Sequence, residues 1–106
     1  MSKKEIMFEI LCERYPEITD ATLNKMSSRL FSTEGYDSVS CVQNNFVYTL
    51  DISDNCRVQF SSFDCITKEH FDRSRLCVEE HDSRYPYSPK AAEIIERINA
   101  ADKERG

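Results

Sequence analysis

Residues 38–60 read SVSCVQNNFVYTLDISDNCRVQF, a stretch in which apolar and polar side chains alternate. An alternation of period two is typical of β-strands, because successive side chains point to opposite faces of a sheet. Asn44 and Asn45 interrupt the alternation, and asparagine tolerates the positive φ that a two-residue hairpin turn requires. Such a turn places Cys41 opposite Tyr48, so the stretch predicts a β-hairpin that continues into a third strand.

The second turn of this stretch is predicted at residues 53–55, Ser-Asp-Asn. It places Ile52 opposite Cys56 and Leu50 opposite Val58, which keeps the large apolar side chains on one face. The other face reads Ser40, Val42, Val47, Thr49, Asp51, Arg57, Gln59 and Ser61. The pattern therefore predicts a three-stranded antiparallel meander with one dry face and one mostly wet face.

Two helices are predicted before the strands. Ser2 and Glu5 form a capping box, and apolar residues at helical spacing follow as far as about Arg14. Apolar residues over 23–31 have the same spacing and predict a second helix, which ends before Gly35.

Two more helices are predicted after the strands, the first over Thr67 to about His81. Pro89 at a first helical position opens the last one. Its apolar stripe is Ala91, Ile94, Ile95, Ile98 and Ala101. The predicted fold is α+β, a single domain over residues 1–106 in the order ααβββαα, with the meander packed on one face by helices. The predicted core is Ile10, Leu11, Leu23, Leu30, Phe46, Tyr48, Leu50, Val58, Phe60, Ile94, Ile95 and Ile98.

Composition restricts the environment and the partners that we expect. The chain has 19 acidic and 14 basic residues and a formal net charge of -5, which favours basic partners over nucleic acid. Its cysteines are odd in number and scattered, as is typical of reduced thiols in the cytoplasm. They are Cys12, Cys41, Cys56, Cys65 and Cys77. No apolar run approaches the roughly 20 residues that cross a bilayer, so we expect no membrane partner.

A Cys/His series gives the alternative hypothesis of a metal-dependent or thiol-dependent protein. On a helix over residues 67–81, His70, Cys77 and His81 share one face, and Cys65 precedes them. The spacing matches no standard zinc module, and a packed helix side explains it equally well. A thiol activated by a histidine base could also act as a catalytic nucleophile. The sequence has few glycines, however, and so offers few tight backbone loops that could bind an oxyanion. We therefore expect no enzyme and no cofactor.

A helix, three antiparallel strands and a helix resemble the topology of double-stranded RNA-binding domains. The resemblance implies that basic groups at the start of the helix after the three strands bind phosphates. Here residues 67–72 read TKEHFD and have mixed charge. RNA binding therefore remains the third hypothesis.

A protein-binding surface is the favoured functional hypothesis. Arg84, Tyr85 and Tyr87 lie in one predicted loop, and arginine and tyrosine are enriched at binding hot spots. A second candidate surface is acidic and consists of Asp51, Asp54 and Asp64. In size and charge the chain is similar to small acidic phage proteins that disarm host nucleases, including the anti-CRISPR proteins. We expect a non-enzymatic inhibitor or adaptor that blocks a basic site on a larger partner, such as a nucleic-acid-handling protein.

The sequence is also compatible with self-association. The predicted strand over residues 38–42 lies at a sheet edge, where unpaired backbone groups can pair with a second copy. A homodimer is therefore compatible with the pattern.

Overall fold

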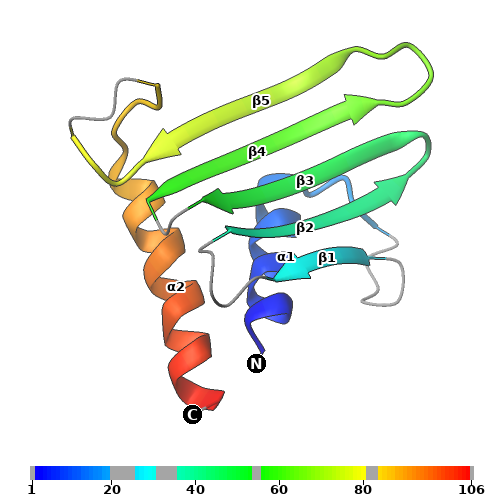
Figure 1. Cartoon of the computed structure of the whole chain (residues 1–106). Coiled ribbons are helices and arrows are strands. Elements are labelled where there is room, and N and C mark those ends of the chain that lie inside the picture. Colours follow the sequence, from blue (N-terminus) through cyan, green and yellow to red (C-terminus); the bar gives the residue numbers. More distant parts are fainter. Residues whose placement is uncertain (1, 20–25, 31–35, 54–55, 81–83, 106) are drawn as a thin grey trace.

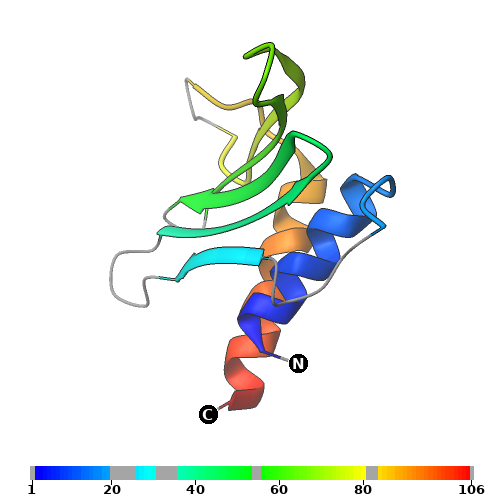
Figure 2. The same cartoon turned by 90° about the vertical axis from the view of Figure 1, so that its right-hand side faces the viewer.

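The computed structural model of the chain describes residues 2–19, 26–30, 36–53, 56–80 and 84–105, and for residues 26–30, 36 and 102–105 only the backbone is considered. Its elements are α1 (Lys3–Arg14), β1 (Met26–Leu30), β2 (Tyr36–Gln43), β3 (Phe46–Ser53), β4 (Arg57–Asp64), β5 (His70–Cys77) and α2 (Pro89–Arg105). The strands form one antiparallel sheet in sequence order, and both helices lie against the same face (Figures 1 and 2). The predicted α+β class with an antiparallel sheet is confirmed, but the numbers of strands and helices are not.

Helix α1 begins and ends where the sequence predicts. The Ser2 hydroxyl accepts the Glu5 N–H at 3.2 Å, and the Glu5 carboxylate accepts the Ser2 N–H at 3.1 Å, which completes the capping box. Pro16 follows the C-cap residue Tyr15 and prevents the helix from continuing. The buried side chains of α1 are Met7, Ile10 and Leu11.

The β2–β3 hairpin confirms the predicted turn and register. Asn44 and Asn45 have φ values of 51° and 71°, the left-handed conformation that a two-residue turn of this kind needs at both positions. Cys41 pairs with Tyr48, as the alternation predicts. Two short polar side chains that tolerate positive φ therefore fix the alignment of the sheet's centre.

Replacing Asn45 with valine is expected to lower the free energy of unfolding by about 1 kcal/mol, because a β-branched residue disfavours positive φ. Replacing Asn45 with glycine should leave stability equal or slightly higher. Urea denaturation of the two variants measures the difference. Equal midpoints for both would contradict a turn with positive φ at this position.

The predicted register of the β3–β4 hairpin is wrong by two residues. Ile52 pairs with Val58 rather than with Cys56, and Ser53 pairs with Arg57. Cys56 instead lies in the loop, where its N–H donates to the Ser53 carbonyl at 3.1 Å. A slip of two residues leaves every side chain on its original face, so the apolar pattern does not exclude it.

The second predicted helix is wrong where the structure describes it. Residues 26–30 form β1, which pairs with β2 from Met26–Cys41 to Leu30–Asp37, while residues 23–25 and 31 lie outside the described residues. The pairing satisfies the backbone groups along an otherwise open edge of β2, and this outweighs the weak helical pattern of a short segment. The edge predicted over residues 38–42 is therefore covered within the chain.

The third predicted helix is also wrong, because its centre forms β5. This strand pairs with β4 from Phe63–His70 to Arg57–Cys77, with an irregularity at Ser62 and Phe63. Polar residues alternate in burial along it, so the period of two is present without the apolar residues that usually reveal it.

The core lies between the helices and one face of the sheet. Of the predicted members, Ile10, Leu11, Tyr48, Leu50, Val58, Phe60, Ile94, Ile95 and Ile98 are buried. Phe46 is partly buried at the edge, whereas Leu23 and the side chain of Leu30 lie outside the described residues. The buried apolar residues not on that list are Met7, Tyr15, Ile18, Val39, Cys41, Ile52, Cys77, Ala91 and Ala101.

Helix α2 confirms the predicted start at Pro89 and the predicted stripe, all five members of which are buried. Neither helix, over the residues described, has an apolar stretch long enough to cross a membrane.

Candidate functional site

Over the residues that the structure describes, no helix covers one face of the sheet, because α1 and α2 both lie on the other (Figure 2); we call this face the open face. Strand alternation and register assign its side chains, since partners across the strands share a face. We define the open face by its described residues: Ser38, Ser40, Val42, Val47, Thr49, Asp51, Ser53, Arg57, Gln59, Ser61, Phe63, His70, Arg73 and Arg75. Because these side chains stand on paired strands, the face is a rigid surface.

Positive charge gathers on the β4–β5 half of the open face. Arg57, Arg73 and Arg75 lie there, and Asp51 is the one acid among the residues that define the face. Gln59 pairs with both Asp51 and Arg75, so Asp51 lies two strands from the nearest arginine of β5. A chain of net charge -5 therefore has a locally basic surface.

Tyr85 lies on this basic half, in the segment that connects β5 to α2. Its hydroxyl is 3.1 Å from Gln59 Oε1 and donates to it. The guanidinium carbons of Arg57 and Arg75 lie 5.6 and 5.8 Å from the centre of its ring, within the range of cation–π attraction. Tyr85 thus joins β4 to β5 on the open side and orients both arginines.

The connecting segment is held at the end of β5 by backbone hydrogen bonds. The Cys77 N–H donates to the Pro86 carbonyl and the Ser88 N–H donates to the Cys77 carbonyl, each at 2.9 Å. Tyr87 forms a parallel bridge with Cys77, and 49% of its surface is exposed. The predicted loop residues Tyr85 and Tyr87 are therefore fixed beside the sheet, and Arg84 is exposed next to them.

The other end of the open face is apolar and aromatic. Val42, Val47, Phe63 and His70 follow one another across β2 to β5. Val42 is 59% exposed, and the rings of Phe63 and His70 are 4.9 Å apart. An apolar row beside a polar and basic area is the composition of a protein interface.

The three predicted acids do not form one surface. Asp51 lies on the open face, while Asp64 ends β4 on the other side of the strand, where its carboxylate accepts the N–H groups of Ile66 and Thr67 at 2.8 and 3.2 Å. Asp54 lies outside the described residues. The carboxylate of Asp64 thus shapes the β4–β5 turn.

The predicted Cys/His series is not assembled on a helix. His70 and Cys77 lie at opposite ends of β5, about 23 Å apart for seven steps along a strand. Cys65 is exposed in the turn beyond β4, and His81 lies outside the described residues. Among the described residues, Cys77 lies instead near Cys56 and Glu79.

A small hollow lies on the helical side, with a volume of about 80 Å³. Its lining consists of Ile10, Glu13, Arg14, Phe60, Leu76, Lys90, Ile94 and Arg97. Arg97 donates to Glu13 at 2.8 Å and Arg14 pairs with Asp72 at 3.1 Å. The hydrogen bond from Arg97 lowers the pKa of Glu13 despite partial burial. These pairs connect α1 to α2 and to β5, so the charged residues that line the hollow have a structural role in holding the helices and the sheet together.

Arg73 and Arg75 are among the open-face residues that are missing from the sequence-based candidates. The signal that could have found them is the run DRSRLC over residues 72–77, in which both arginines occupy alternate positions of a period-two pattern.

Comparison of the chain with protein-family models, with curated proteins and with solved structures gave no match.

Proposed function

We propose that this chain is a non-enzymatic protein-binding module whose open face docks on an acidic surface of a partner protein, as an inhibitor or adaptor. The observation that carries the proposal is the uncovered sheet face with three arginines on one half and an apolar row at one end. Arginine and aromatic residues dominate binding energy at interfaces.

The partner surface that we propose is acidic, whereas the hypothesis from the sequence is a basic partner. That hypothesis depends on clustered carboxylates, and Asp51 and Asp64 lie on different sides of the sheet. Arg57, Arg73 and Arg75 instead favour carboxylates, with which guanidinium groups form paired hydrogen bonds. The partner we propose therefore has acidic residues opposite β4 and β5 and an apolar patch opposite the row from Val42 to His70.

A protein suits this surface better than a nucleic acid. The net charge of -5 repels a polyanion at long range, whereas a folded partner needs acids only where it meets the arginines. Ser40, Thr49 and Ser61 form the cross-strand row that ends at Arg73, next to the apolar row, and their hydroxyl groups suit the hydrogen bonds of a protein interface.

Replacing Arg73 with glutamate is expected to weaken capture of the partner by about tenfold or more, because a like charge then faces its acids. A photo-crosslinking residue at Ser61, on the open face, would identify the partner in native lysate, and calorimetry with that partner gives the affinity. Arg73 is exposed, so the variant should unfold within about 0.5 kcal/mol of the parent.

Lys90→Glu provides the matched control, because it makes the same change of charge at an exposed position of α2. It should retain the affinity of the parent. An equal loss of affinity in both variants would contradict the proposal. So would crosslinks from Glu96 on α2 that are as strong as those from Ser61, or crosslinked products that nuclease rather than protease removes.

A further inference from the structure

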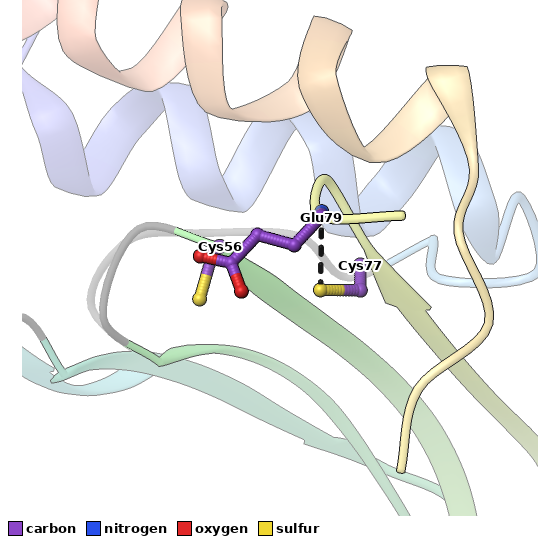
Figure 3. Close-up of side chains that lie close together, drawn as sticks. All are labelled: Cys56, Cys77 and Glu79. Atoms are coloured by element: carbon purple, nitrogen blue, oxygen red, sulfur yellow. Dashed lines mark hydrogen bonds between the residues drawn. The ribbon is translucent and has the colours of Figure 1, made fainter. Parts of the chain in front are cut away.

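Cys56, Cys77 and Glu79 bring two sulfur atoms and a carboxylate together at the end of the sheet where α2 begins. One ligand atom from each residue lies within 4.8 Å of the others, and Figure 3 shows the three side chains around one small space. Cys56 comes from the β3–β4 loop, Cys77 ends β5, and Glu79 follows two residues later. Cys77 pairs with Arg57, so it lies on the same side of β5 as the open face, at the end that the segment around Pro86 covers. Cys56 and Glu79 belong neither to the open face as defined above nor to the hollow between the helices.

The backbone holds the three residues in place without a ligand. The Val78 N–H donates to the Cys56 carbonyl at 2.8 Å, which ties the loop to the end of β5. The Glu79 N–H donates to Cys77 Sγ at 3.3 Å, and Cys56 Sγ lies 3.8 Å from the Ser53 carbonyl. Cys77 is fixed further by its bonds to Pro86 and Ser88. A site on positions held by such backbone hydrogen bonds needs little reorganisation when an ion binds.

The donor set indicates the kind of ion. Thiolates are soft ligands that select ions such as Zn²⁺ over Mg²⁺ or Ca²⁺, and zinc also accepts a carboxylate oxygen. Two thiolates and a carboxylate bring three negative charges to a divalent cation, and binding expels two thiol protons to solvent. Tetrahedral Zn²⁺ with bonds of about 2.0–2.3 Å needs ligand atoms slightly closer than 4.8 Å, which side-chain rotation of Glu79 and Cys56 can supply.

We propose that Cys56, Cys77 and Glu79 form a Zn²⁺ site, with the fourth position of the tetrahedron open to water. Glu79 is exposed and Cys56 is partly exposed, so the ion enters from their side, while buried Cys77 forms the floor. The bound ion clamps the β3–β4 loop to the end of β5. Because the folded chain assembles the three ligands and the unfolded chain does not, binding stabilises the fold.

The test uses the full chain, purified metal-free with a phosphine reductant and titrated with Zn²⁺. We expect one zinc per chain after gel filtration, a melting temperature that rises with Zn²⁺ and falls again with chelator, and thiolate-to-metal absorption with Co²⁺. Cys56→Ser and Glu79→Gln change the ligands that are not fully buried, so the fold should survive, and each should weaken binding at least about tenfold.

Cys65→Ser and His70→Ala are the matched controls, since both residues are exposed and lie at the far end of β5. Both should bind Zn²⁺ like the parent. Unchanged binding in Cys56→Ser and Glu79→Gln, loss of binding in the controls, or no zinc-dependent change in melting would each overturn the proposal. The proposal would also be overturned if Cys56 and Cys77 form a disulfide without reductant, as found by mass, and the reduced chain binds no Zn²⁺.

Discussion

Replacing Lys3 with methionine is expected to lower the free energy of unfolding by about 3–5 kcal/mol. Lys3 Nζ lies 2.6 Å from Asp37 Oδ2, and the side chains are only 12% and 2% exposed. The variant keeps the aliphatic stem of Lys3 but removes a cation that directly contacts the buried carboxylate, so the desolvation of that charge is compensated less well. Chemical denaturation followed by circular dichroism measures the loss.

Two further variants test whether charge is the cause. Lys4→Met changes the neighbouring lysine of α1, for which no ion pair is described, and should cost less than about 0.5 kcal/mol. Adding Asp37→Asn to Lys3→Met removes the buried charge and should recover most of the stability. A double variant no more stable than Lys3→Met would show that the ion pair does not explain the loss.

Replacing Leu50 with alanine is expected to lower the free energy of unfolding by about 2–5 kcal/mol. Leu50 lies on β3, the central strand, and is fully buried between the sheet and the helices. Truncation removes apolar contacts and leaves a cavity that strands fixed by pairing on both sides cannot close. The same denaturation experiment gives the change.

Thr49→Ala is the control for this second experiment, because Thr49 is the adjacent residue of β3 and points to the open face. It should change stability by less than about 1 kcal/mol, within the effect of strand propensity. Similar losses for Leu50→Ala and Thr49→Ala would contradict the assignment of the dry face.

The centre of the fold was predictable because its signals agree. Asn44 and Asn45 fix one register, the capping box at Ser2 fixes the start of α1, and Pro89 fixes the start of α2. Each signal depends on residues close together in the sequence, so it can be interpreted without knowing the rest of the fold.

The outer strands could not be predicted in the same way. Strand β1 is short and gains its hydrogen bonds from β2, so tertiary pairing decides its structure. Strand β5 is largely polar, because one of its faces is open and the other is not buried over its whole length. Phe71, near the start of the strand, is 62% exposed. Without alternation of apolar residues, the helical spacing of His70, Cys77 and His81 suggests the wrong period.

The candidate sites depend on these outer elements. Arg75 becomes a neighbour of Tyr85, and Arg73 pairs with Ser61 on the open face, only once residues 70–77 form a strand. Cys56 and Cys77 are separated by a hairpin in the sequence, and no short motif connects them with Glu79. The sequence identifies Tyr85 and Cys77 as candidates, whereas their partners follow from strand pairing.

The order of the strands in the sheet, identical to their order along the chain, governs how the fold is reached during synthesis. Each strand finds its partner across a short loop, so the sheet can form hairpin by hairpin as it leaves the ribosome. The contact between α1 and α2 must wait until the end of the chain has been made, since Glu13 meets Arg97, 84 positions later. Until α2 has been made, the part of the apolar face that α2 covers is open to chaperones and to neighbouring nascent chains.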